Sequence, residues 1–190
     1  MNAYEKWFCG TRFWRWVTRR QLLPWILQGS ELGEHVLELG AGLGATTDEL
    51  GRRAAQVTSL EYDHTFVANL GARSNVSNGA VIQGDAARLP FADGTFSSAI
   101  AILMLHHLRS TELQDRAFAE IRRVLQPGGV FLAFEIQDGW LHRVGHIKST
   151  FVPVMPASAN GRLTAVGFSK VTVDFRRGGF RIRALRPIEG

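Results

Sequence analysis

Short apolar runs alternate along the chain with longer segments whose apolar residues recur at helical spacing. The runs are predicted as strands because they are short and bounded by turn residues. They span residues 35–39, 56–61, 80–84, 96–105 and 130–136. The helical segments between them span residues 45–53, 63–74 and 110–125. This alternation predicts an α/β fold, and strands that are apolar on both faces predict a parallel sheet covered by helices on both sides.

The pattern changes after residue 137. Residues 140–151 have helical spacing, and a loop (152–160) and a short helix (161–167) are expected to follow. Two runs of alternating polar and apolar residues, 168–175 and 180–187, flank the sequence RRGG, which is typical of a hairpin. We therefore predict a seven-stranded, mostly parallel sheet that ends in an antiparallel hairpin.

Residues 11–28 form an N-terminal segment of helical spacing, and a loop is expected at 29–34. Pro24 lies inside the segment, where it either kinks the helix or begins a second one. The apolar positions of the segment are Phe13, Trp16, Val17, Leu23, Ile26 and Leu27. Because these positions share one side of a helix, we expect them to pack against the domain.

Composition places the chain among ordinary globular proteins. It has 190 residues, enough for one domain, of which 45% are hydrophobic and 21% charged. No apolar run approaches the roughly 20 residues of a membrane-spanning helix, and no secretory signal is evident. Cys9 is the only cysteine, which fits a cytoplasmic location. The net charge of +5 comes from arginines near the two ends, so we expect no nucleic-acid partner.

A glycine-rich loop follows the first predicted strand, in the sequence VLELGAGLGATTDEL. Glycine lets the backbone approach a ligand closely and directs the free N–H groups of the next helix toward it. One glycine would suffice for a tight turn, so three (Gly40, Gly42 and Gly44) favour a ligand-binding loop. The pattern Gly40-x-Gly42-x-x-Ala45, with Glu61 downstream, also satisfies a relaxed dinucleotide fingerprint.

Polar residues follow the other parallel strands. Glu61 ends the second strand, where a carboxylate can bind both hydroxyls of a ribose. Asp85 follows the third strand in GDAARLPF, and His106 and His107 follow the fourth in LHHLR. The carboxyl ends of parallel strands meet at one edge of a sheet, so these residues are expected to line a common ligand site.

The motifs and their order, over about residues 36–135, resemble the class I S-adenosylmethionine-dependent methyltransferases, in particular the type 11 methyltransferases. The resemblance implies a Rossmann-like three-layer sandwich and a single domain over residues 1–190. Its parts would be an N-terminal helical lid or cap (1–30), a cofactor-binding core (35–136), a late helical insertion (137–167) and a terminal hairpin (168–190). The implied reaction transfers a methyl group from S-adenosylmethionine to a small-molecule acceptor and leaves S-adenosylhomocysteine.

The same resemblance implies the residues that face the methionine part of the cofactor. The three glycines of the loop would lie against it, with Glu38 supporting its amino group. Leu103 and Met104 would offer backbone groups. Many relatives carry a polar residue at the place of Leu103, so a side-chain contact from that position is missing here.

The adenosine part would be held by four further residues. Glu61 would bind the ribose hydroxyls, and Tyr62 would pack on the adenine. Asp85 would accept from the adenine amino group, and the backbone N–H of Ala86 would contact the ring.

His106 and His107 are candidate general bases, since they follow the strand end that should reach the methyl group. The alternative is a structural role, in which they cap the next helix or pack under the loop. His142 and His146 are four residues apart, but no third ligand is in sight, so we expect no metal site.

Several alternatives stay open. The chain could methylate a phospholipid or lipid-quinone at the membrane surface, or bind S-adenosylmethionine without catalysis. An NAD-dependent short-chain oxidoreductase is disfavoured, because the only tyrosines, Tyr4 and Tyr62, form no Tyr-x-x-x-Lys pair. The Trp- and Arg-rich residues 4–20 could pack on the domain, close the acceptor pocket as a lid, or contact lipid, and we favour packing. The sequence does not predict the oligomeric state.

Overall fold

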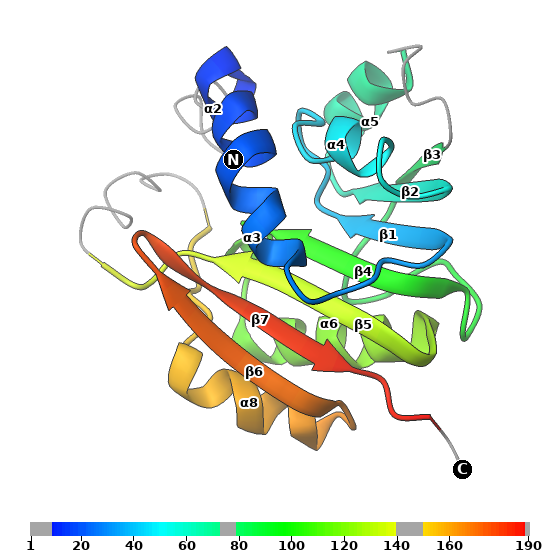
Figure 1. Cartoon of the computed structure of the whole chain (residues 1–190). Coiled ribbons are helices and arrows are strands. Elements are labelled where there is room, and N and C mark those ends of the chain that lie inside the picture. The colour runs from blue at the N-terminus through cyan, green and yellow to red at the C-terminus, as the bar shows by residue number, and fades with distance from the viewer. Residues whose placement is uncertain (1–8, 73–78, 140–149, 189–190) are drawn as a thin grey trace.

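The computed structural model describes residues 9–72, 79–139 and 150–188 of the chain, and contains a seven-stranded sheet in the order β3-β2-β1-β4-β5-β7-β6 (Figure 1). The strands are β1 (His35–Leu39), β2 (Gln56–Glu61), β3 (Gly79–Gln83), β4 (Phe96–Ile102), β5 (Leu125–Glu135), β6 (Ser169–Arg176) and β7 (Gly179–Leu185). The first five run parallel to one another, whereas β7 pairs antiparallel with both β5 and β6. The predicted α/β fold and terminal hairpin are therefore confirmed.

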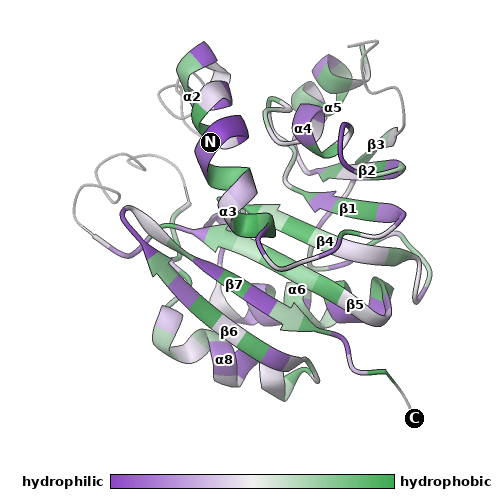
Figure 2. Cartoon of the chain, in the orientation of Figure 1, coloured by the Kyte–Doolittle hydropathy of each residue, from purple (hydrophilic) through white to green (hydrophobic). Residues whose placement is uncertain are grey.

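Helices cover both faces of the sheet (Figure 1). One face carries α2 (Arg12–Val17), η1 (Thr18–Leu22), α3 (Leu23–Leu27), α4 (Thr47–Leu50) and α5 (His64–Gly71). The other face carries α6 (Thr111–Val124) and α8 (Pro156–Ala165). Each layer has its own apolar cluster, in which Ile100 and Leu132 of the central strands meet the first layer, and Phe118 and Phe131 lie in the second. Figure 2 shows hydrophobic colour along the central strands and alternation in β6.

The strand order reverses at β1. Its neighbours are β2 on one side and β4 on the other, both parallel to it, with Leu39 opposite Leu60 and Ala101. The connections that leave β1 and β4 therefore depart on opposite faces, which opens a crevice beyond their carboxyl ends. In folds of this topology, ligands bind in this crevice, so we expect the functional site there.

The N-terminal segment is a continuous helical rod with one irregular turn. The N–H of Leu23 donates to the carbonyl of Thr18, five residues back, so η1 is a π-helical turn. Pro24, which has no N–H, lies in the first turn of α3. Of the two predictions, a kink or the start of a second helix, the second is confirmed. Leu23 and Ile26 are buried in the core as predicted.

The burial prediction is wrong for two residues of this rod. Phe13 keeps 62% of its surface exposed and Trp16 keeps 51%. Helical spacing shows which residues share a side, but no element of the described chain covers this side of α2. The two rings stack on each other instead, with centroids 6.3 Å apart.

Several predicted boundaries also shift. Helix α8 begins at Pro156, inside the predicted loop 152–160, because proline needs no N–H partner in a first helical turn. Helix α4 has only four residues of the predicted 45–53. Strand β4 ends at Ile102, and a 3₁₀ turn (Leu105–His107) follows it. The predicted helix 140–151 lies almost wholly outside the described residues, as do His142 and His146.

None of the helices in the described parts of the chain combines the length and the apolar character needed to cross a membrane.

Candidate active site

A cavity of about 780 Å³ lies beyond the carboxyl ends of β1, β2 and β4. Its size is in the range of small-molecule and cofactor sites. Ten of the predicted site residues line it: Gly40, Gly42, Glu61, Tyr62, Asp85, Ala86, Leu103, Met104, His106 and His107. Glu38 and Gly44 do not line it. The sheet thus brings the predicted residues of four separate loops to one place.

The glycine loop is shaped by its contact with the segment that follows β4. Gly40 has a φ of 75°, and a Cβ built on it would lie 2.3 Å from Cγ of Met104. Its N–H donates to the carbonyl of Leu60 on β2, at 2.8 Å. Only glycine permits both this backbone conformation and the approach of the Met104 side chain.

Glu61 ties the glycine loop to the turn that leaves β2. Its carboxylate is buried, and Oε2 accepts a hydrogen bond from the N–H of Gly42 at 2.8 Å. Oε1 accepts from the N–H of Asp63 at 2.9 Å. Each oxygen of a carboxylate has a second acceptor position, so both remain able to accept from a ligand hydroxyl.

Glu38 lies behind the glycine loop, near the end of β1. Its Oε2 accepts from the hydroxyl of Thr47 on α4 at 2.6 Å and from the hydroxyl of Ser59 on β2 at 2.7 Å. Burial raises the pKa of this carboxyl to about 7, although both hydroxyls act in the opposite direction. The side chain therefore joins three elements beneath the cavity.

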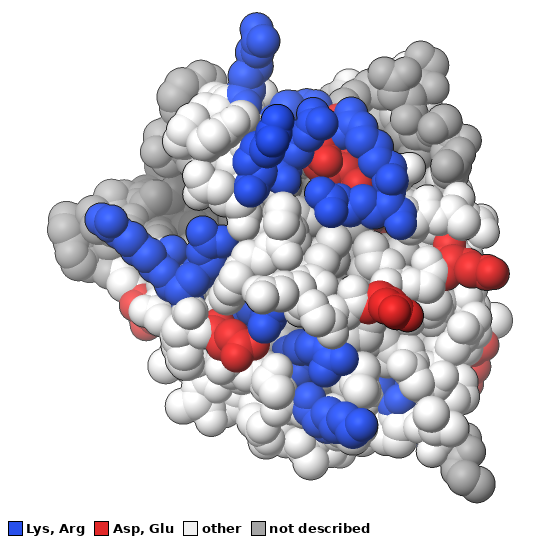
Figure 3. All heavy atoms as spheres, viewed as in Figure 1, with Lys and Arg blue, Asp and Glu red and all other residues white. Residues whose placement is uncertain are grey.

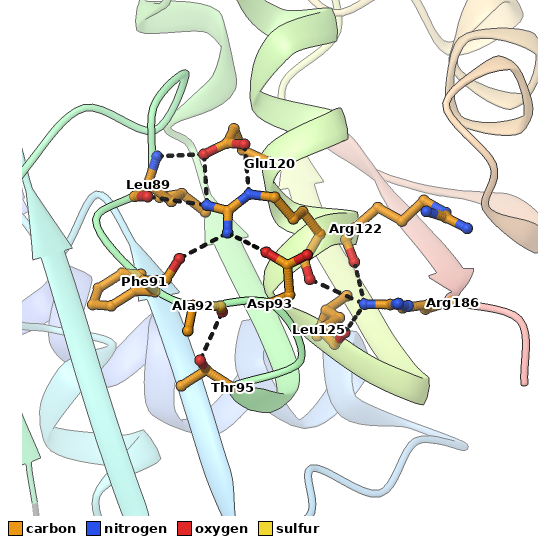
Figure 4. Close-up of polar contacts among 10 residues, drawn as sticks. Leu89, Phe91, Ala92, Asp93, Thr95, Glu120, Arg122, Leu125 and Arg186 are labelled. Carbon is orange, nitrogen blue, oxygen red and sulfur yellow. Dashed lines mark hydrogen bonds and ion pairs between the residues drawn. The ribbon is translucent and has the colours of Figure 1, made fainter. Parts of the chain in front are cut away.

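Arg123 of α6 holds the loop that follows Asp85 and Ala86 (Figure 4). Its guanidinium donates to the carbonyls of Leu89 (3.1 Å) and Phe91 (2.8 Å). Glu120, one turn earlier on α6, pairs with Arg123 and accepts the N–H of Leu89 at 2.7 Å. The loop that follows the predicted adenine-binding residues is thereby held by α6, which lies on the face of the sheet opposite α4 and α5.

Glu135, at the end of β5, organises the segment that follows β4. It is fully buried, and its Oε1 accepts from the N–H groups of Met104 (3.1 Å) and Leu105 (2.8 Å). Its Oε2 lies 2.5 Å from Nδ1 of His106. Leu103, just before, has a φ of 55°, a strained value for a residue other than glycine. Such strain persists only where the surroundings hold it, as the hydrogen bonds to Glu135 do here.

His106 is buried at the cavity wall. An ionised Glu135 can only accept, so beside it Nδ1 of His106 donates and Nε2 is the acceptor nitrogen of the neutral ring. The ring packs against Phe151, with centroids 5.4 Å apart, and the His106 carbonyl accepts from the N–H of Val152 at 2.8 Å. His107 lies beside it, with Nδ1 3.2 Å from the carbonyl of Thr150.

Glu135 was not among the residues predicted to form the site. The signal was a single acidic residue at the end of the apolar run VFLAFE. A buried carboxylate at a strand end needs partners, and only the folded structure shows that one of them is His106.

The strand order, the glycine loop and the cavity at the switch point define a Rossmann-like α/β protein of the nucleotide-cofactor-binding class. Residues 37–133, about half of the chain, match the methyltransferase domain family, and the chain belongs to that family.

Individual relatives agree with this assignment. The chain is 35% identical over 124 residues to a demethylmenaquinone methyltransferase of Beutenbergia cavernae, which covers 65% of this chain and 47% of the relative. It is 28% identical over 137 residues to a sterol 24-C-methyltransferase of Schizosaccharomyces pombe, covering 70% of this chain and 35% of the relative. The chain spans about half the length of the demethylmenaquinone methyltransferases that it matches.

Solved structures share the fold. The N-methyltransferase NodS from Bradyrhizobium japonicum, determined with S-adenosyl-L-homocysteine, superposes with a TM-score of 0.75 at 18% sequence identity. The superposition covers 98% of this chain and 93% of that one.

Proposed function

We propose that the chain binds S-adenosylmethionine in the cavity and transfers its methyl group to a small-molecule acceptor, releasing S-adenosylhomocysteine. The observation that carries the proposal is the convergence of the glycine loop, Glu61, Asp85 and the segment 103–107 on one cavity. Membership of the methyltransferase domain family supports it.

The adenosine would lie between the ends of β2 and β3. Glu61 has acceptor positions for both ribose hydroxyls, and Asp85 and Ala86 would contact the adenine edge. Tyr62 is mostly exposed on the cavity rim, from which its ring could cover the base. The glycine loop and the backbone of Leu103 and Met104 would hold the methionine part, above the buried Glu38.

The cofactor would supply a methyl group already activated on a sulfonium. The chain has to align the acceptor atom with that methyl group and exclude water, and alignment alone can contribute about 7–11 kcal/mol. Where the acceptor must lose a proton, Nε2 of His106 would take it. Glu135 would hold the ring and stabilise the imidazolium that forms.

The acceptor would contact the lining residues that the cofactor does not use. They include the apolar side chains of Ile102, Leu108, Leu113 and Ile136, together with Arg109 and Thr150. Two of the relatives are named as methyltransferases of demethylmenaquinone and of a sterol. Both of these molecules are apolar, which supports an apolar acceptor for this chain.

Calorimetry with S-adenosylhomocysteine tests the cofactor assignment. Glu61→Gln should weaken binding by about 1–3 kcal/mol, because the amide cannot accept from ribose and backbone donors at both positions. Glu31→Gln, an exposed carboxylate near the surface loop, is the matched control and should bind as the unaltered chain does. Undiminished affinity of Glu61→Gln would remove that residue from the site, and preferential binding of NAD would overturn the assignment.

Product formation against a panel of acceptors separates an enzyme from a binding protein. Release of S-adenosylhomocysteine that depends on an added acceptor would support methyl transfer. Tight cofactor binding with no turnover on any acceptor class would favour a non-catalytic role.

A further inference from the structure

Helix α2 presents an aromatic pair to solvent. Phe13 and Trp16 lie three residues apart on one side of the helix and stack on each other with an interplanar angle of 24°. Two large apolar rings that stay exposed side by side form an apolar surface, of the kind that marks an interaction site. Nothing in the proposed methyl transfer uses this side of the helix.

Exposed arginines lie on the same helical rod and on the turn that follows α4. They are Arg12, Arg19, Arg20, Arg52 and Arg53. The acidic residues beside them are already engaged, since Asp48 pairs with Arg15 and Glu49 pairs with Arg19 and Arg52. Six arginines and two acids leave an excess of four positive charges over this region. Figure 3 shows the basic atoms as a ring around the small acidic patch, over α2 and α4.

We propose that this aromatic–arginine surface, made of Phe13, Trp16 and the five exposed arginines, docks the chain on an anionic phospholipid bilayer. Aromatic rings partition into the headgroup region, and guanidinium groups pair with lipid phosphates. A cluster of arginines is attracted to an anionic leaflet, and each arginine adds its own share to the binding free energy. The inference goes beyond the proposed methyl transfer and does not depend on it.

The shape of the surface favours a bilayer over a nucleic acid. Single strands bind in basic grooves whose aromatic rings are open to stack with bases. Here the two rings stack on each other, and neither they nor the five arginines line the candidate active-site cavity or the smaller cavity beside Gly42 and Leu43. An exposed aromatic pair on a helix that also carries exposed arginines suits a broad planar partner.

The same helix connects this surface to the cavity. Trp14 lies between the two exposed aromatic residues in sequence and lines the cavity wall. Docking through α2 would therefore bring the cavity close to the bilayer surface.

Co-sedimentation of the full chain with vesicles tests the proposal. We expect binding to phosphatidylcholine vesicles that contain phosphatidylserine, and little binding to pure phosphatidylcholine. Salt that shortens the Debye length from about 8 Å to about 3 Å should release most of the protein. The double variant Phe13→Ser/Trp16→Ser should lose roughly tenfold in affinity. Arg12→Gln/Arg20→Gln should lose about 25-fold, at roughly fivefold for each arginine.

Two matched controls lie away from this surface. Ile188→Ser removes an apolar side chain that is 79% exposed and lies after β7, near the C-terminus of the chain. Arg116→Gln removes an exposed arginine from α6, on the opposite face of the sheet. Both should bind as the unaltered chain does. Thermal melts of all four variants would confirm that they stay folded, as expected for exposed positions.

Three results would overturn the proposal. The first is equal binding to neutral and anionic vesicles. The second is full binding by the aromatic variant, which would reduce the surface to a general charge effect. The third is displacement from vesicles by single-stranded RNA together with tight RNA binding that needs the same residues, which would assign the surface to a nucleic acid.

Discussion

Replacing Glu38 by glutamine should change how stability depends on pH. In the folded chain, burial raises the pKa of the Glu38 carboxyl to about 7, from an ordinary value of 4.5. Between these two values the folded state keeps a proton that the unfolded state releases. The free energy of unfolding therefore falls as pH rises through this window. The shift corresponds to about 3 kcal/mol, present below pH 4.5 and lost above pH 7.

Glutamine preserves the shape of the side chain and removes its titration. Both hydroxyl donors, from Thr47 and Ser59, reach the same oxygen of Glu38, so the amide oxygen can accept both. Glu38→Gln should therefore gain about 3 kcal/mol relative to the unaltered chain between about pH 5 and about pH 8. Urea unfolding of both proteins across this range measures the difference, and every other titrating group cancels in it.

The exposed Glu31→Gln variant is the control, and its curve should run parallel to that of the unaltered chain. Parallel curves for Glu38→Gln as well would refute the argument, because they would mean that Glu38 titrates alike in the folded and unfolded states. A changed m-value would instead signal an altered native or unfolded state and disqualify the comparison.

Two further substitutions test the active-site assignment. Glu135→Gln should lower kcat by about 100-fold or more, because its amide N–H₂ faces Nδ1 of His106 and moves the ring proton to Nε2. The affinity for S-adenosylhomocysteine should stay nearly constant, and equal loss of kcat and cofactor affinity would indicate a structural role. Gly40→Ala should weaken cofactor binding and cost about 1–3 kcal/mol of stability, since its φ of 75° and the 2.3 Å approach to Met104 both exclude a Cβ. Unchanged urea unfolding and calorimetry would show that the loop adapts.

The sheet and the cofactor side of the cavity could be predicted because their signals are local. Apolar runs and turn residues mark each strand, and the carboxyl ends of parallel strands share an edge whatever the intervening helices do. Glu61 and Asp85 needed only that rule to be placed together. The hairpin followed from two alternating runs separated by RRGG, and β6 and β7 pair as expected, with Phe175 opposite Phe180.

The rest depends on contacts between distant parts of the chain. The role of Glu135 arises because the chain after β4 turns at Leu103 and presents two backbone N–H groups and the ring of His106 to the end of β5. The exposure of Phe13 could not be predicted either, since periodicity gives the sides of a helix but not the neighbour that each side meets. Pro156 was assigned to a loop, although it begins α8, because proline is compatible with both.

Three buried carboxylates at strand ends hold the elements that surround the cavity. Glu38, Glu61 and Glu135 lie at or near the ends of β1, β2 and β5, and all are almost fully buried. Each accepts hydrogen bonds from the loop or helix that forms its part of the cavity, so the cavity walls are fixed by the strand ends. Their negative charges are costly to bury together, and the charge of Glu61 contributes to the raised pKa of Glu38. A ligand with a sulfonium and an ammonium group would relieve that cost, because a cation beside Glu61 and in front of the carboxylates behind the cavity wall favours their ionised forms. The electrostatics of the cavity and of the proposed cofactor are therefore complementary, so the same carboxylates affect both the stability of the protein and the chemistry that it is proposed to perform.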